Sequence, residues 1–178
     1  MSSTRAPLSR SRTMYELYRE LEGNDNEISN GIGRTLKVLE RSGRAASETY
    51  LAASRALRAL SETWSRHMEI ERELFPRMLC DNVLPAESLL RIAEDSKAIE
   101  KQLAAILAAP WPRWTQAGMQ SIRIAGIQVL AQLLAQTETE RAAILPAISR
   151  KDRKAPASDI YASALPNSTN SRACALSA

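Results

Sequence analysis

The chain has 178 residues and a formal net charge of +4, and its apolar residues, 44% of the total, are mainly Ala, Leu and Ile. With six glycines and 4% aromatic residues, this composition favours helices over sheets. No uncharged run is long enough to span a membrane, no early apolar run resembles a signal peptide, and the basic residues are not interleaved with aromatic ones as single-stranded nucleic acid would require. Two cysteines define no disulfide framework. We therefore expect a cytoplasmic all-α protein that binds neither membranes nor nucleic acid.

The two ends of the chain lack a helical period. Residues 1–11 and 150–178 are rich in Ser, Ala, Pro and Arg, and we predict that both are disordered tails. The folded domain is then expected over residues 12–149.

A short amphipathic segment opens this domain. From Thr13 to Glu22, Met14, Leu17 and Leu21 recur on one side, and Gly23 follows. This pattern predicts a short extra N-terminal helix. We expect it to cap the domain, or to bind a protein partner or a second copy of the chain as a homodimer.

Four longer amphipathic segments follow. They cover about residues 25–42, 47–79, 86–109 and 115–149, and Gly43, Pro85 and Pro110 mark the connections. Apolar residues recur in each at steps of three and four, which is typical of a helix with one buried face. Four helices with short connections predict an up-down-up-down antiparallel four-helix bundle.

Each apolar stripe is interrupted by polar residues. The stripe of the second helix shows this most clearly, and it reads Leu57, Leu60, Trp64, His67, Glu71, Leu74 and Met78. The polar members of the four stripes are Ser29, His67, Glu71, Ser96, Gln136 and Glu140. In the expected bundle the second and fourth helices run parallel, so the pairs His67-Glu71 and Gln136-Glu140 can face each other. We predict one polar layer inside the core.

Two of these segments carry a family resemblance. H67-MEI-E71 is followed by Leu-Phe-Pro at residues 74–76, and Q136-TET-E140 by Ile-Leu-Pro at residues 144–146. This layout resembles the hemerythrin-like domain, also called the HHE cation-binding domain, over about residues 24–149. The resemblance implies a bundle in which histidines and carboxylates from all four helices bind two non-haem irons. The remaining histidine positions of the family then fall on Ser29, Ser96 and Gln136.

With a single histidine, the resemblance does not extend to oxygen carriage, because serine and glutamine are poor iron ligands. Two interpretations stay open. In one, His67, Glu71 and Glu140, helped by Gln136, bind one divalent ion such as iron, manganese or zinc. In the other, no cofactor is required, and His67 pairs with a glutamate in a metal-free polar layer.

The function that we expect is that of a divergent hemerythrin-like protein, a non-oxygen-carrying sensory or regulatory bundle with at most one metal ion in its core. A metal-free scaffold or dimerising interaction protein is the first alternative. A metal-dependent oxidase-type enzyme is the second, although its pattern needs four carboxylates. We assign no catalytic residue, since one histidine leaves little for acid–base chemistry.

Overall fold

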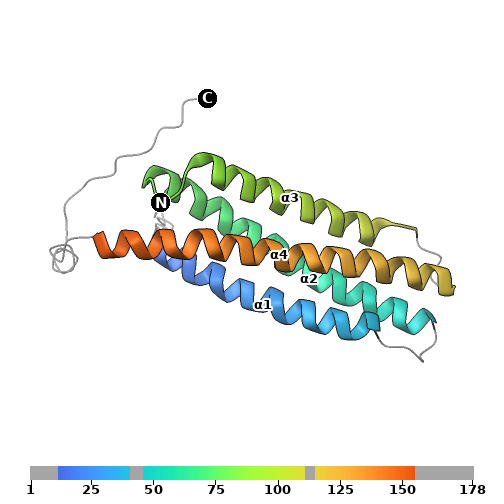
Figure 1. The fold of residues 1–178 in the computed structure, drawn as a ribbon. Helices are drawn as coiled ribbons and strands as arrows, with labels where there is room; N and C mark the ends of the chain where they lie inside the picture. Colours follow the sequence, from blue (N-terminus) through green and yellow to red (C-terminus); the bar gives the residue numbers. More distant parts are fainter. Residues whose placement is uncertain (1–11, 41–45, 111–114, 155–178) are drawn as a thin grey trace, which may run out of the picture.

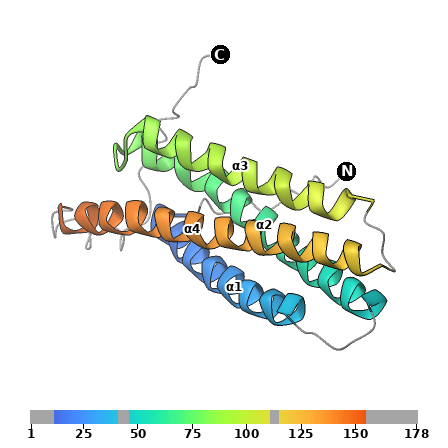
Figure 2. The same cartoon turned by 45° about the vertical axis from the view of Figure 1, so that its right-hand side comes forward.

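A computed structural model of the chain describes residues 12–40, 46–110 and 115–154. They form four helices, α1 (Met14–Glu40), α2 (Ala46–Cys80), α3 (Ala86–Ala108) and α4 (Gln116–Lys154), with no strand in the ranges given. The colours in Figure 1 show consecutive helices running in opposite directions, and Figures 1 and 2 place α4 between α1 and α3. The predicted all-α four-helix bundle is therefore confirmed.

The domain limits differ in part from the prediction. α4 continues to Lys154, past the expected end of the domain at residue 149. The predicted tail at residues 1–11, and the remainder of the other tail from residue 155, lie outside the described residues. None of the helices in the described ranges combines the length and the apolarity that a membrane span requires.

The first helix corrects the prediction of a separate N-terminal helix. Thr13 to Glu22 is the beginning of α1, which continues through Gly23 to Glu40. Its start is a capping box, in which the Glu16 amide donates to Thr13 Oγ1 at 3.1 Å and the Thr13 amide donates to Glu16 Oε2 at 2.6 Å. Glycine weakens a helix by only about 1 kcal/mol, and burial of Leu17 and Leu21 in the bundle core offsets this. Whether this segment also binds a partner stays a prediction.

At the predicted turn between α2 and α3, helix α2 ends in a Schellman motif. Asn82 has a φ of 51°, a left-handed conformation that asparagine tolerates better than most residues. The amide of Val83 donates to the Met78 carbonyl at 2.8 Å, and that of Asn82 to the Leu79 carbonyl at 3.1 Å. This tight end lets α3 return directly along α2.

The core is divided into two apolar clusters. One contains Leu57, Trp64 and Leu133, and the other contains Leu17, Leu74 and Ile144. In every helix the chain passes from one cluster to the other across one to three buried polar residues. Six of them lie around His67, and we call these six the polar layer: Asp25, His67, Glu71, Ser96, Gln136 and Glu140.

Candidate metal site

Three side chains at the centre of the polar layer offer metal ligands. His67 and Glu140 are 0% exposed and Glu71 is 4% exposed. Nε2 of His67 lies 2.8 Å from Oε2 of Glu140 and 3.5 Å from Oε1 of Glu71. One ligand atom from each residue lies within 4.8 Å of the other two. This buried group can hold a metal ion.

Ser96 and Gln136 lie in the same layer. The Ser96 hydroxyl donates to Oε1 of Glu71 at 3.0 Å. The Gln136 amide donates to Oε1 of Glu140 at 2.8 Å and to the Ile92 carbonyl at 3.1 Å. Both residues therefore hold the glutamate carboxylates in place.

Ser29 does not belong to the layer, and this part of the prediction is wrong. Its side chain is exposed, and α1 contributes Asp25, which is 6% exposed, in its place. The reason is the continuity of α1, since counting on from Leu21 in steps of four and three reaches Asp25 and then Ile28. That spacing is present in the sequence, but an assumed break at Gly23 hides it.

Asp25 contacts the second nitrogen of the imidazole. Its Oδ1 lies 3.2 Å from Nδ1 of His67. The distance suits an ion pair, but neither atom has a well-directed hydrogen-bond partner among the described residues. Buried polar atoms are rarely left in this state. Oδ1 of Asp25 therefore retains capacity to accept a further hydrogen bond.

Trp64 fixes the plane of the imidazole. Its ring stacks on His67 with centroids 4.6 Å apart and an angle of 9° between the planes. The indole N–H donates to the Ser96 carbonyl at 3.1 Å, so that the indole itself is anchored to α3. A protonated imidazole over an indole face is also stabilised by the π electrons.

The titration of the layer reflects its excess of carboxylates. Burial disfavours protonated His67, but its contacts with Asp25, Glu140 and Glu71 outweigh this, and the pKa of His67 rises to about 11. Burial also raises the pKa of Glu140 to about 7; the hydrogen bond from His67 lowers it, and the nearby Glu71 charge raises it. His67 is therefore an imidazolium near neutral pH, and Glu140 is poised to exchange a proton.

The charges in the layer do not balance. Asp25, Glu71 and Glu140 surround one imidazolium, so full ionisation leaves two uncompensated negative charges. A buried unpaired charge costs several kcal/mol. Protonation of Glu140 removes one of these charges, and a divalent cation in place of the imidazolium proton would also remove one.

A small crevice lies beside this region. It lies between α1 and α4 and is lined by Tyr18, Glu22, Asp25, Glu140 and Arg141. Its volume is about 10 Å³, roughly the room for one water molecule. Asp25 and Glu140 line this crevice, and Gln136, on the other side of α4, lines a larger one with Ile99 and Gln102.

Comparisons with protein-family models, curated proteins and solved structures give no match. The chemistry of the site therefore has to be argued from its own donors. One imidazole nitrogen and two carboxylates suit one hard divalent ion. They do not fit the histidine-rich di-iron centre that the hemerythrin resemblance implies.

Proposed function

We propose that this protein is a divergent hemerythrin-like regulatory bundle whose polar layer exchanges protons for a single divalent cation. The observation that carries the proposal is the presence of three buried carboxylates around one imidazole. Apolar residues of similar volume would often make a bundle equally stable or more stable. A layer with excess negative charge is therefore better explained by a ligand than by stability.

The residues that would hold the ion are His67, Glu71 and Glu140, while Asp25, on the Nδ1 side of the ring, would orient the imidazole. When bound, the ion supplies a fixed positive charge that compensates the carboxylates. Ser96 and Gln136 keep Glu71 and Glu140 turned inward. Trp64 holds the imidazole plane, and the apolar clusters on either side exclude water from the layer.

Binding must displace protons. Imidazole ligates a metal only in its neutral form, whereas His67 is protonated near neutral pH because its pKa is raised to about 11. Glu140, with a pKa raised to about 7, contributes a further fraction of a proton. Cation affinity should therefore increase with pH, and this exchange gives the bundle two charge states that a partner can distinguish.

A metal-free scaffold is the second candidate, and one observation favours it. Glu140 already accepts hydrogen bonds of 2.8 Å from both His67 and Gln136, so this carboxylate is well satisfied without a metal. In this case the layer would determine only which helices pair with which.

Metal content and thermal stability separate the two candidates. The protein is purified with manganese, iron or zinc supplied, and metal per chain and melting temperature are measured. We expect about one equivalent and a higher melting temperature with metal. Loss of both effects is expected in His67→Ala and Glu140→Gln.

The matched control is Glu69→Gln. Glu69 is exposed and lies two positions from both His67 and Glu71 on α2. The substitution therefore removes a carboxylate without changing the polar layer. Less than about a tenth of an equivalent in the wild type, with a melting temperature indifferent to metal, would exclude the metal-binding function and leave the scaffold.

A further inference from the structure

Half of the large apolar side chains exposed on the described part of the chain lie on α4. They are Ile124, Ile127, Leu134 and Leu145, with exposed fractions of 50%, 39%, 42% and 41%, and the others are spread over α1, α2 and α3. Together with exposed Ala131, Ile124, Ile127 and Leu134 recur at steps of three and four, and so lie on one side of the helix. We call Ile124, Ile127, Ala131 and Leu134 the outer stripe.

The outer stripe lies on a helix whose other side is already used by the core. Ile122, Val129 and Leu133 of α4 are buried against the rest of the bundle. A helix that is apolar on two sides buries both when its assembly is complete. The second side of α4 therefore has no counterpart within the described part of this chain.

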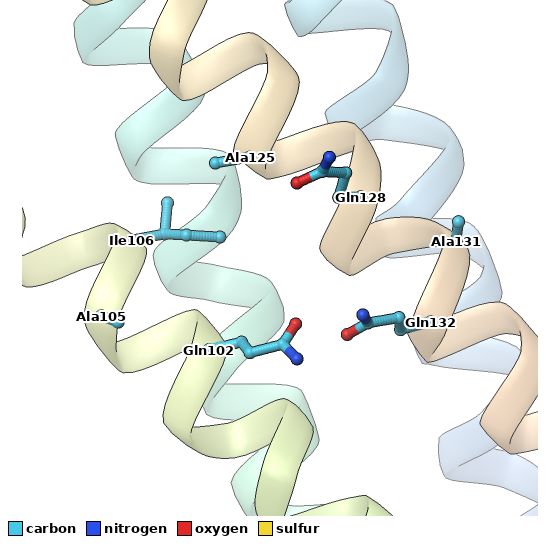
Figure 3. Close-up of a pocket in the computed structure, with 7 residues that line it drawn as sticks. All are labelled: Gln102, Ala105, Ile106, Ala125, Gln128, Ala131 and Gln132. Atoms are coloured by element: carbon cyan, nitrogen blue, oxygen red, sulfur yellow. The ribbon is translucent and has the colours of Figure 1, made fainter.

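The outer stripe lies in an uncharged segment of α4. Residues 124–137 (IAGIQVLAQLLAQT) include no charged residue, in a chain of which 25% is charged. Figure 3 shows Gln102 of α3 and Gln132 of α4 pointing toward one another across a groove between the two helices, with Ile106 of α3 in the same lining. An apolar centre without charges and with polar groups at its edge is typical of a protein interface.

Two charged residues border the outer stripe. Arg123 precedes it and Glu138 follows it; both are exposed, and neither forms an ion pair within the described ranges. Positions 123 and 138 share their midpoint, between residues 130 and 131, with positions 127 and 134. Rotation by a two-fold axis at this midpoint brings Arg123 of one copy toward Glu138 of the other and Ile127 toward Leu134. The surface is thus complementary to itself in charge and in apolar character.

We propose that the protein forms a two-fold symmetric homodimer in which the outer stripes of two α4 helices pack antiparallel. A parallel arrangement would place like charges together, which disfavours it. Ala131, close to the axis, lets the two helices approach. A second copy is the occupant because an isologous interface requires self-complementarity, which this face has.

Sedimentation equilibrium over a concentration series tests the dimer. The wild type is expected at twice the 19.7 kDa chain mass, and Leu134→Glu at the monomer mass, because the dimer would hold two unpaired carboxylates near its axis. Leu51→Glu is the matched control: Leu51 is 46% exposed but lies on α2, so this variant should remain dimeric. Circular dichroism establishes that each variant keeps its helices.

A charge swap tests the antiparallel register. Arg123→Glu and Glu138→Arg should each weaken the dimer by about tenfold. The double variant restores both attractions and should recover most of the wild-type affinity. A wild type that stays monomeric, a dimer that survives Leu134→Glu, or a double variant weaker than both single ones would each overturn the proposal.

Discussion

His67 is the residue on which the polar layer depends, because it is the only positive group within the described ranges that forms ion pairs with Asp25, Glu71 and Glu140. Its two nitrogens serve different helices, with Nδ1 toward α1 and Nε2 toward α2 and α4. Trp64 holds the ring plane that makes this division possible. A lysine could supply the charge, but not two donors in fixed opposite directions.

The raised pKa values of Glu140 and His67 give stability a defined pH dependence. The pKa of Glu140 rises from 4.5 to about 7 and that of His67 from 6.5 to about 11. The folded protein therefore holds more protons than the unfolded chain across this range, so these groups make the free energy of unfolding fall as pH rises. The loss of stability that is due to Glu140 is absent below pH 4.5 and complete above pH 7. The His67 contribution is full below pH 6.5 and is lost as pH rises through 11.

Urea unfolding in chelator at a series of pH values measures this loss. Glu140→Gln, which keeps the shape and cannot ionise, should remove the decline between about pH 5 and pH 7 that is due to Glu140, on the order of 1 to 3 kcal/mol, and leave the His67 decline at higher pH. Glu69→Gln, an exposed change on α2, should leave the decline in place. If Glu140→Gln declines as steeply as the wild type, Glu140 does not titrate in this range.

Asp25 is the layer residue that sequence reasoning missed, while His67, Glu71, Ser96, Gln136 and Glu140 all lie where the helical spacing placed them. Within one uninterrupted helix the spacing determines the buried side, and α2 and α3 allowed no ambiguity. For α1, the side predicted to be buried depends on whether the helix is counted from before Gly23 or restarted after it. The charge of Asp25 also argued against burial, because the imidazole that compensates it comes from another helix.

At the scale of the helices, Gly23 decides how α1 is interpreted. A glycine after an amphipathic segment is a common helix end, and this is why the sequence suggested a break. The capping box at Thr13 and Glu16 is the competing signal, and burial of Leu17 and Leu21 on the same side as Ile28 and Ile32 decides between them. Such long-range packing cannot be judged from local spacing.

Gly23→Ala tests the continuity of α1. A Cβ at residue 23 would meet nothing within 4 Å, so alanine should stabilise the protein by about 0.5 to 1 kcal/mol in thermal or urea unfolding. Gly126→Val is the contrasting change, because a Cβ there would lie 2.9 Å from Cδ1 of Leu39, and it should destabilise. A destabilising Gly23→Ala would instead indicate that the helix breaks at this glycine.

At the scale of the whole molecule, we expect the polar layer to lower the stability of the bundle relative to an apolar core. Replacing its members together by apolar residues should leave the bundle as stable as the wild type or more stable by about 1 to 4 kcal/mol, since buried ion pairs seldom outperform apolar packing. The changes are Asp25→Leu, His67→Leu, Glu71→Leu, Ser96→Ala, Gln136→Leu and Glu140→Leu. His67→Leu alone should cost about 3 to 5 kcal/mol, because it leaves the carboxylates without their cation.

Chemical denaturation of the two variants in chelator provides the comparison. If the sixfold variant loses its cooperative transition, the layer is needed to specify the fold, and the scaffold interpretation gains. If His67→Leu and the sixfold variant both lower the free energy of unfolding, the charges of the layer are not coupled in the way that the contacts of His67 indicate.

The division of the core into two clusters also has a kinetic consequence. Regions with separate apolar packing can open in separate local unfolding events, each with its own free energy. The cluster around Leu17, Leu74 and Ile144 covers one side of the layer, at the end where α1 begins. Partial opening of that end exposes Asp25 and Glu140 while the Leu57, Trp64 and Leu133 cluster remains packed. We therefore expect the rate at which the buried carboxylates exchange protons with solvent to depend on local unfolding of this end of the bundle and not on global unfolding.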